Sequence, residues 1–351
     1  MTRKMAGGGM FVYVSNEISG DIFVLQLAPE SGDLTLVEKV AVGERVMPMA
    51  VSPDRRFLFA SLRTQPFAVA SFAINPLSGR LTHLANTPLP HSMVHISTDR
   101  NGRFLFGAAS IPEILPQSCL ISVSAIGPHG FVQPVHQFIR TEPKMHAILP
   151  DASNRYVFAT SCDGDLILRQ RFDAATGKFS LDPLPPVRVK ANAGPRHFVF
   201  HPNNRFLYVL NEKDATVCAF GFDAGSGALD ELQILSALPP DYDPKRAPHA
   251  YDLHLTPDGR FLYASEGTSS TLAAYKVDLA SGMLTPAGNY PTEKKPRGFN
   301  IDPYGRYLLV AGVDSHSMTA YAIDRETGNL TRLKQYPMGK NPNWIEIVSL
   351  P

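Results

Sequence analysis

The chain has 351 residues, of which 44% are hydrophobic and 19% are charged, and Lys plus Arg number 33 against 32 for Asp plus Glu. This near-neutral balance, with no long basic run, argues against nucleic acid or an anionic membrane surface as the partner. No apolar stretch approaches the ~18 residues that cross a membrane, so we expect a globular protein with a sizeable core.

The first nine residues, MTRKMAGGG, are expected to be a flexible leader, followed by one domain over residues 10–351. Arg3 and Lys4 are not followed by the apolar segment of a secretory signal, because strand-forming residues begin at Phe11. The start of the chain therefore indicates no export signal.

The three cysteines, Cys119, Cys162 and Cys218, are odd in number, far apart and outside the spacings of zinc ligands. This pattern is typical of reduced thiols in a cytoplasmic protein. No metal, cofactor or disulfide is predicted, and the sequence does not indicate an oligomeric state.

One short pattern recurs along the chain: a tight turn, an arginine and an apolar strand, as in PNNRFLYV at residues 202–209. Asn, Asp and Gly at turn positions followed by aromatic and aliphatic residues predict a hairpin that enters a buried strand. The arginines of the six copies are Arg56, Arg103, Arg155, Arg205, Arg260 and Arg306. Because they recur in every copy, these arginines are interpreted as structural.

A second pattern places a glycine turn before a strand of the Leu-Thr type, as in SGMLT at residues 281–285. Its glycines are Gly32, Gly79, Gly130, Gly177, Gly227, Gly282 and Gly328. The chain therefore contains seven units of about fifty residues.

The seventh unit is split between the two ends of the chain. MFVYVSNE at residues 10–17 matches RFLYVLNE at residues 205–212, and the strand that should precede it is found in NPNWIEIVSL at residues 341–350. Pairing the two termini in one sheet closes a ring and removes the free edges. The sequence therefore predicts an all-β, seven-bladed β-propeller with four strands per blade, rather than an open solenoid.

In a propeller the first strand of each blade lines the central channel. Counting nine residues back from each repeated arginine finds the start of that strand, at Met47, Val94, His146, Arg196, Tyr251 and Arg297. Counting seven forward finds the end of the second strand, at Arg63, Ser110, Cys162, Glu212, Gly267 and Val313, with Glu17 in the split blade. Antiparallel pairing puts both sets at the same face, where two arginines beside a histidine and an acid indicate an anionic-ligand site.

Other polar residues receive different interpretations. His201, His254 and Trp344 are expected to pack between blades, and His197 to brace Arg196. His249 and His316 lie in loops from which a side chain reaches the same face. No GxSxG, HExxH or phosphate-binding glycine loop is present, and the Trp-Asp blade ending of scaffolding propellers is missing.

The chain resembles the propeller-type lactonases, which include bacterial 6-phosphogluconolactonases and a carboxymuconate cycloisomerase of the same fold. The resemblance extends from about Phe11 to Ile347. It is carried by VSPDRRFLF, HISTD, GPRHFVFHP, NEKDATV, DLHLTPDGRFLYA and KPRGFNID. The active-site His, Arg, Glu and Arg proposed for that family fall on His146, Arg196, Glu212 and Arg297, which the strand register selects independently.

Two segments depart from the pattern of the bacterial members. Glu266-Gly267 replaces an Asp-Arg or Asn-Arg pair, and the longer, apolar IPEILPQ at residues 111–117 replaces a Ser-Tyr-Asn-x-Gly turn. Both changes fall on the rim that would hold the distal end of a substrate. We therefore expect a sugar-acid lactone as substrate, either phosphorylated or unphosphorylated.

The expected mechanism is hydrolysis without a metal. His146 is expected to act as general base, kept neutral by the arginines, with Glu212 orienting it or holding the water, although their roles are interchangeable at this stage. Arg196 is expected to stabilise the oxyanion, and Arg297 with Arg63 to bind the carboxylate or phosphate of the substrate. Glu17, His197, His249, Tyr251 and Glu266 are further candidates for contact with the substrate.

Two alternatives remain open from the sequence. The same arginine pair suits cycloisomerisation of a muconate-like diacid. A noncatalytic ligand-binding or scaffold propeller is the third hypothesis; it predicts that the charges of the mouth are dispensable and that a partner binds the rims of the blades.

Overall fold

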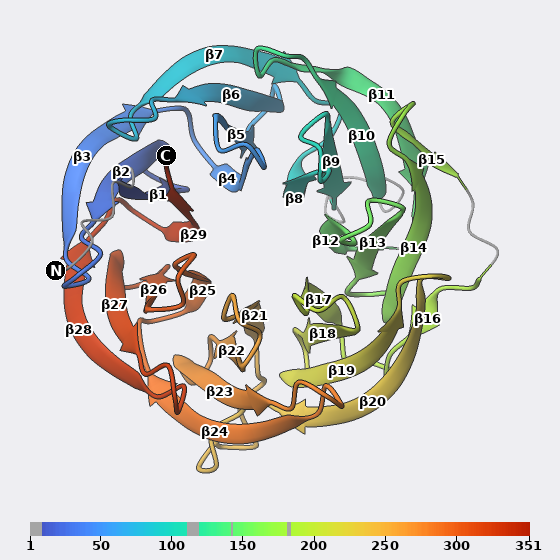
Figure 1. Cartoon of the computed structure of the whole chain (residues 1–351), viewed down its shortest axis with the longest axis vertical. Coiled ribbons are helices and arrows are strands. Elements are labelled where there is room, and N and C mark those ends of the chain that lie inside the picture. The colour runs from blue at the N-terminus through green and yellow to red at the C-terminus, as the bar shows by residue number, and fades with distance from the viewer. Residues whose placement is uncertain (1–8, 111–118, 142, 181–183) are drawn as a thin grey trace, which may run out of the picture.

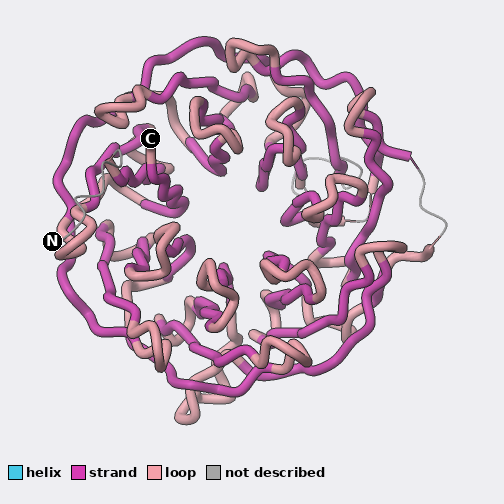
Figure 2. The backbone as a smooth tube through the Cα atoms, in the orientation of Figure 1, coloured by secondary structure: helices cyan, strands magenta, loops and turns pink. Residues whose placement is uncertain are grey.

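The computed structural model describes residues 9–110, 119–141, 143–180 and 184–351. These residues form seven antiparallel sheets arranged radially as the blades of a propeller (Figure 1). They contain strands and loops but no helix (Figure 2), and so no helix that could span a membrane. The predicted leader lies almost wholly outside the described residues.

In each blade the first strand lies nearest the centre of the ring and the last strand lies at its rim. The first three blades along the chain comprise β4 Val46–Val51, β5 Phe57–Leu62, β6 Ala68–Ile74 and β7 Leu81–Pro88; β8 Met93–Thr98, β9 Phe104–Ala109, β10 Leu120–Ile126 and β11 Val132–Arg140; and β12 Met145–Pro150, β13 Tyr156–Ser161, β14 Leu166–Asp173 and β15 Lys178–Ser180, with β16 Val187–Arg188 on β14. The next three comprise β17 Pro195–Phe200, β18 Phe206–Asn211, β19 Thr216–Asp223 and β20 Ala228–Ser236; β21 Ala250–Leu255, β22 Phe261–Glu266, β23 Thr271–Val277 and β24 Leu284–Pro291; and β25 Pro296–Ile301, β26 Tyr307–Gly312, β27 Ser317–Ile323 and β28 Leu330–Pro337.

The remaining blade is built from both ends of the chain. It comprises β29 Pro342–Ser349, β1 Met10–Asn16, β2 Asp21–Leu27 and β3 Leu34–Ala41. Strand β29 pairs antiparallel with β1, so that Ile345 lies opposite Val14. The predicted closure of the ring by the two termini is confirmed.

The repeated turn has one backbone conformation in every copy. The residue just before the repeated arginine has a positive φ in all six copies, for example 58° at Asn204 and 74° at Gly259. A side chain four residues before the arginine holds the turn: Asp99 accepts hydrogen bonds from the backbone N–H groups of Arg103 and Phe104. The arginine guanidinium stacks on the next aromatic ring, as in Arg205 over Phe206, which confirms a structural role.

The glycines of the second pattern join each blade to its neighbour. A Cβ atom on Gly282 would lie 2.4 Å from the ring of Phe206 in the adjacent blade, where φ is +75°. Tyr208 of that blade donates its hydroxyl hydrogen bond to the carbonyl of Gly282. The same contact between glycine and aromatic ring occurs at Gly32, Gly79, Gly130, Gly177, Gly227 and Gly328.

Replacing Gly282 with alanine is expected to lower the free energy of unfolding by about 2–4 kcal/mol, because the new methyl group meets an unfavourable φ and displaces an aromatic ring. Thermal unfolding monitored by circular dichroism measures this loss. Gly221→Ala is the matched control, since a Cβ atom there would have its nearest contact at 3.8 Å. Equal melting temperatures for the two variants would contradict this account of the joint between blades.

The inner strands all carry a bulge where they enter the channel. On β17 the register with β18 shifts between Pro195 and Phe198, and each of the other inner strands has a shift at the same level. A bulge interrupts the alternation of side chains between the two faces of a strand. Consecutive residues such as Arg196 and His197 can therefore both serve the channel.

Candidate active site

The predicted strand ends meet at one end of the central channel. Pro195 at the start of β17 pairs with Asn211 at the end of β18, which brings Arg196 beside Glu212. Equivalent pairings in the neighbouring blades place His146, Tyr251 and Arg297 at the same level. We call this end of the channel the Glu212 mouth.

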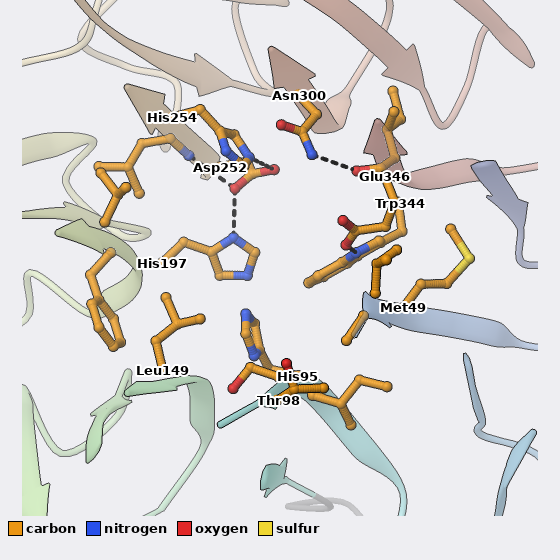
Figure 3. Close-up of a pocket in the computed structure, with 18 of the residues that line it drawn as sticks. Met49, His95, Thr98, Leu149, His197, Asp252, His254, Asn300, Trp344 and Glu346 are labelled. Carbon is orange, nitrogen blue, oxygen red and sulfur yellow. Dashed lines mark hydrogen bonds and ion pairs between the residues drawn. The ribbon is translucent and has the colours of Figure 1, made fainter. Parts of the chain in front are cut away.

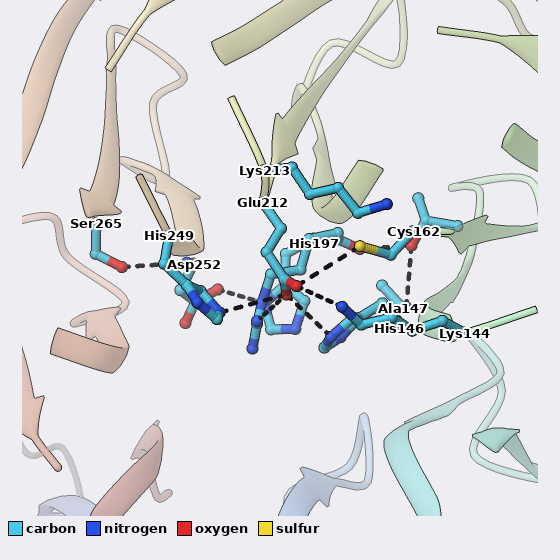
Figure 4. Close-up of polar contacts among 12 residues, drawn as sticks. Lys144, His146, Ala147, Cys162, His197, Glu212, Lys213, His249, Asp252 and Ser265 are labelled. Carbon is cyan, nitrogen blue, oxygen red and sulfur yellow. Dashed lines mark hydrogen bonds and ion pairs between the residues drawn. The ribbon is translucent and has the colours of Figure 1, made fainter. Parts of the chain in front are cut away.

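Glu212 is the centre of the polar contacts at this mouth (Figure 4). Its Oε2 accepts a hydrogen bond of 2.6 Å from Arg196 Nη1, and its Oε1 accepts one of 2.6 Å from Lys144 Nζ. His146 Nε2 lies 3.4 Å and His249 Nε2 3.7 Å from Oε2. The carboxylate is thus bound by two cations and faced by two imidazoles.

The same contacts determine the charge states. Burial would raise the pKa of Glu212, but the polar contact with His146 and the charges of Arg196 and Lys144 hold it far below its usual range. Burial and the charge of Arg196 keep the pKa of His146 well below 6.5 against the opposing effect of Glu212. At neutral pH the site therefore contains an ionised Glu212 and a neutral His146. Both pKa shifts have the direction that the sequence predicted.

A second group of charges lies around Glu17. Arg297 Nη1 is 3.9 Å from Glu17 Oε2, the atom that also accepts a 2.9 Å hydrogen bond from Asn343 Nδ2. Arg45 Nε contacts the other oxygen at 3.3 Å. Burial and the nearby charge of Arg196 lower the pKa of Arg297, and 27% of its side chain is exposed. This arginine has a long, weak ion pair and an accessible face.

Tyr251 forms one wall beside Arg196. The Arg196 guanidinium lies 5.0 Å from the centre of the Tyr251 ring, and the ring of His249 packs on the other side at 4.6 Å. A Cβ atom on Gly267 would lie 2.1 Å from Tyr251 Cε2. Gly267 therefore makes room for the tyrosine.

Glu266 is a correction to the sequence prediction. Its side chain is fully buried, and its carboxylate accepts hydrogen bonds from the backbone N–H groups of His249, Thr268 and Ser269. It therefore holds the loop that carries His249 and presents no free oxygen to a substrate. The other departure in this rim, residues 111–117, lies outside the described residues.

Arg63 and His316 lie at the same face but are engaged elsewhere. Arg63 Nε donates to Ser92 at 2.9 Å, and its Nη1 approaches the sulfur of Met47. His316 Nδ1 accepts from the backbone N–H of Asn341. Both side chains thus have partners other than Glu212, and Arg63 is held against Ser92 and Met47.

The structure also corrects several predictions for the inner strands. His197 donates from Nδ1 to Asp252, at 2.7 Å, in place of bracing the side chain of Arg196. His254 and Trp344 line a cavity in the channel, whereas His201 is buried against Gly259 of the next blade as predicted. The bulges described above explain these errors. Simple alternation places the side chains of His254 and Trp344 between blades, but the bulges turn them toward the channel.

Lys144 is the residue of the cluster that the sequence analysis missed. It lies two residues before His146 and has a positive φ of 52°. Arg45 and Lys295 occupy the equivalent positions before Met47 and Arg297, with φ of 56° and 51°. Aligning the blades two residues further upstream would have revealed this ring of cations.

Metal binding was also considered. Among the described residues no group of three or more His, Cys, Asp or Glu side chains is arranged to hold a metal ion. All three cysteines are buried free thiols.

Comparison with known proteins agrees with this architecture. Residues 9–347 match the family model described as lactonase, 7-bladed beta-propeller. A 6-phosphogluconolactonase of Pectobacterium carotovorum is 41% identical over 83% of this chain and 84% of its own length, and one of Yersinia pseudotuberculosis is 37% identical over 83% and 84%.

Solved structures show the same fold. A putative 6-phosphogluconolactonase from Bacteroides fragilis superposes with a TM-score of 0.88 at 25% identity, covering 99% of both chains. A periplasmic gluconolactonase of Pseudomonas aeruginosa gives 0.89 at 24% identity, covering 97% of this chain and 100% of that one. The latter similarity concerns the fold alone.

Proposed function

The chain belongs to the lactonase family of seven-bladed β-propellers, and on that basis we propose that it hydrolyses a sugar-acid lactone at the Glu212 mouth. The observation that carries the proposal is the pairing of an ionised Glu212 with Arg196 beside a neutral His146. Ester hydrolysis needs a base for water and a positive group for the oxyanion, and this cluster contains both.

His146 is assigned as the general base. Its contact of 3.4 Å with Glu212 is longer than an ordinary N–H···O hydrogen bond, so a water molecule bound at the mouth can displace this contact and donate to the Nε2 lone pair. Glu212 is a much weaker base, because its cations hold its pKa far below its usual range. Glu212 therefore holds the water and stabilises the imidazolium that forms when His146 takes the proton.

Arg196 and Arg297 are assigned to the charges of the substrate. Water adds to the acyl carbon while Arg196 stabilises the developing oxyanion. When the ring C–O bond breaks, the imidazolium of His146 returns the proton to the leaving alkoxide, giving a hydroxyl and a carboxylic acid. The acid then loses its proton to solvent and becomes a carboxylate. Arg297, with its accessible face, binds the carboxylate or phosphate, and Arg63 is positioned across the mouth for the distal end of a longer substrate.

The relatives named 6-phosphogluconolactonase make 6-phosphogluconolactone the first candidate substrate. The rim beside Tyr251 supports an anion, because Arg246, Lys294 and Lys295 line a hollow of about 410 Å³ there and outnumber its one acid, Asp314, which pairs with Lys295 at 2.8 Å. We place the protein in the cytoplasm on the strength of its three free thiols, which favour a reducing compartment.

A substrate panel tests the proposal. Proton release at pH 7 is measured with 6-phosphogluconolactone, gluconolactone and an aldarolactone, each corrected for spontaneous opening. Proton uptake is measured with carboxymuconate, because closing a lactone from a carboxylate consumes a proton. We expect enzyme-dependent opening of at least one sugar lactone, unchanged by a chelator. Turnover of carboxymuconate alone would assign the site to cycloisomerisation, and chelator sensitivity would contradict the metal-free mechanism.

A further inference from the structure

The central channel contains a second cavity beyond the Glu212 mouth. It has a volume of about 340 Å³, in the range of small-molecule sites, and is lined by residues from all seven inner strands (Figure 3). The lining begins one residue after the mouth position on four strands, at His95, His197, Asp252 and Trp344, and two or three residues after it on the other three. It extends to Arg100 in the turn after β8. We call this cavity the lower chamber.

A layer of aromatic rings lies between the mouth and the lower chamber. The rings of His95, His197 and Trp344 contact one another edge to face, with centroid distances of 5.5 Å, 5.4 Å and 5.8 Å. All three residues directly follow the mouth position of their strands, and the ring of His146 lies 5.9 Å from that of His197. The lower chamber is thus a compartment with its own wall.

Asp252 fixes the tautomer of His197. Its carboxylate accepts from His197 Nδ1 at 2.7 Å, from His254 Nε2 at 3.2 Å and from two backbone N–H groups. Burial would raise the pKa of Asp252, but the neighbouring imidazoles keep it well below its usual range. The neutral His197 therefore has its hydrogen on Nδ1 and an acceptor lone pair on Nε2.

His95 has the opposite tautomer. The backbone N–H of Ile148 points at its Nδ1 at 3.4 Å, so Nδ1 is the acceptor and Nε2 carries the hydrogen. Burial and the nearby His197 lower the pKa of His95 to about 3, which keeps it neutral. In Figure 3 the imidazoles of His95 and His197 face each other. With these tautomers His95 provides a donor and His197 an acceptor.

Glu346 and Trp344 complete the polar wall. Trp344 Nε1 donates to Glu346 Oε1 at 2.9 Å, which leaves the second carboxyl oxygen for a ligand. Burial raises the pKa of Glu346 to about 7, so its carboxyl group is partly protonated at neutral pH and both donates and accepts.

The charges of the lower chamber do not favour an ion. Arg100 is the only arginine or lysine among its described lining residues, and its guanidinium already donates to the carbonyls of Asp151 and Pro150. The carboxylate of Asp252 is already bound by four donors. Hydroxyl groups, which donate and accept together, match this arrangement.

We propose that the lower chamber is a second ligand site, which binds a neutral polyhydroxylated molecule such as a hexose or hexitol through His95, His197 and Glu346. This site is separate from the Glu212 mouth and does not depend on the reaction proposed there. Its ligand carries neither an anionic group nor a lactone bond.

Tryptophan fluorescence tests the proposal, because Trp344 is the single tryptophan of the chain and lines the lower chamber. Titration of the full chain with D-glucose and with D-glucitol is expected to change the emission saturably for at least one of them. Glu346→Gln and His95→Phe should each weaken this binding about tenfold through the loss of a hydrogen-bonding group. Glu346→Gln keeps an oxygen for the Trp344 N–H, and circular dichroism checks that both variants fold.

Arg297→Ala is the control, because it changes only the mouth and should leave polyol binding unaltered. A non-saturating response, an equal response in Glu346→Gln, or a response to 6-phosphogluconate in place of the neutral polyols would overturn the proposal. An Arg297→Ala protein that has lost lactone hydrolysis but still binds polyol would show that the two sites are independent, so that each proposal can be tested without the other.

Discussion

Replacing Arg196 with alanine is expected to lower kcat for lactone hydrolysis by about 10²–10³-fold, the usual cost of losing one oxyanion-stabilising donor. Arg196 is almost completely buried, and its Nη1 lies 2.6 Å from Glu212. Its loss also raises the pKa of Glu212 toward the ordinary range, while Lys144 at 2.6 Å still pairs with the carboxylate. Steady-state kinetics measured together with thermal unfolding separates the catalytic effect from any loss of stability.

Arg205→Ala in the same blade is the matched control for this prediction. Arg205 is exposed, stacks on Phe206 and donates to the carbonyl of Ala280 in the next blade, at the end of β18 opposite the mouth. Its removal should change stability slightly and leave kcat within about twofold. If Arg205→Ala and Arg196→Ala lower kcat equally, the special role of Arg196 is refuted.

Replacing His146 with alanine is expected to lower kcat by about 10²-fold or more, because a general base contributes at least that much. The wild-type rate should fall only at pH values well below 6.5, since burial and Arg196 lower the pKa of His146 and the neutral form is the active one. The variant should lose this acid limb of its pH profile. Measurements of kcat from pH 4 to pH 8 for both proteins test the two statements together.

His249→Ala is the informative comparison for the base. His249 Nε2 also approaches Glu212, at 3.7 Å, but about half of its side chain is exposed. We expect its removal to cost only a few-fold in kcat. If His249→Ala lowers kcat strongly while His146→Ala stays within a few-fold of wild type, the general base is His249 and not His146.

The repeats made the fold and the central cluster predictable. Six blades carry the same turn and all seven carry the same glycine, so one copy such as residues 194–212 provides the register of the two inner strands for the others. Counting from the repeated arginines found His146, Arg196, Glu212 and Arg297, which the structure brings to one end of the channel. Their catalytic roles stay predictions.

Several side chains were not predictable, for identifiable physical reasons. The bulges of the inner strands break the alternation on which the placement of Trp344 and His254 rested. Glu266 was expected to face the substrate, but backbone donors of its own loop enclose its carboxylate, and only three-dimensional structure reveals those. Lys144 precedes its strand in a turn with positive φ, outside the strand register that was counted.

The most direct test of the central claim is the rate at which 6-phosphogluconolactone releases protons at pH 7, above its spontaneous opening. The comparison is between the wild-type protein and the His146→Ala, Arg196→Ala double variant, with circular dichroism showing that both keep the fold. The account predicts a wild-type rate proportional to protein concentration and a double variant close to the spontaneous rate. A double variant as fast as wild type would show that hydrolysis does not take place at the Glu212 mouth.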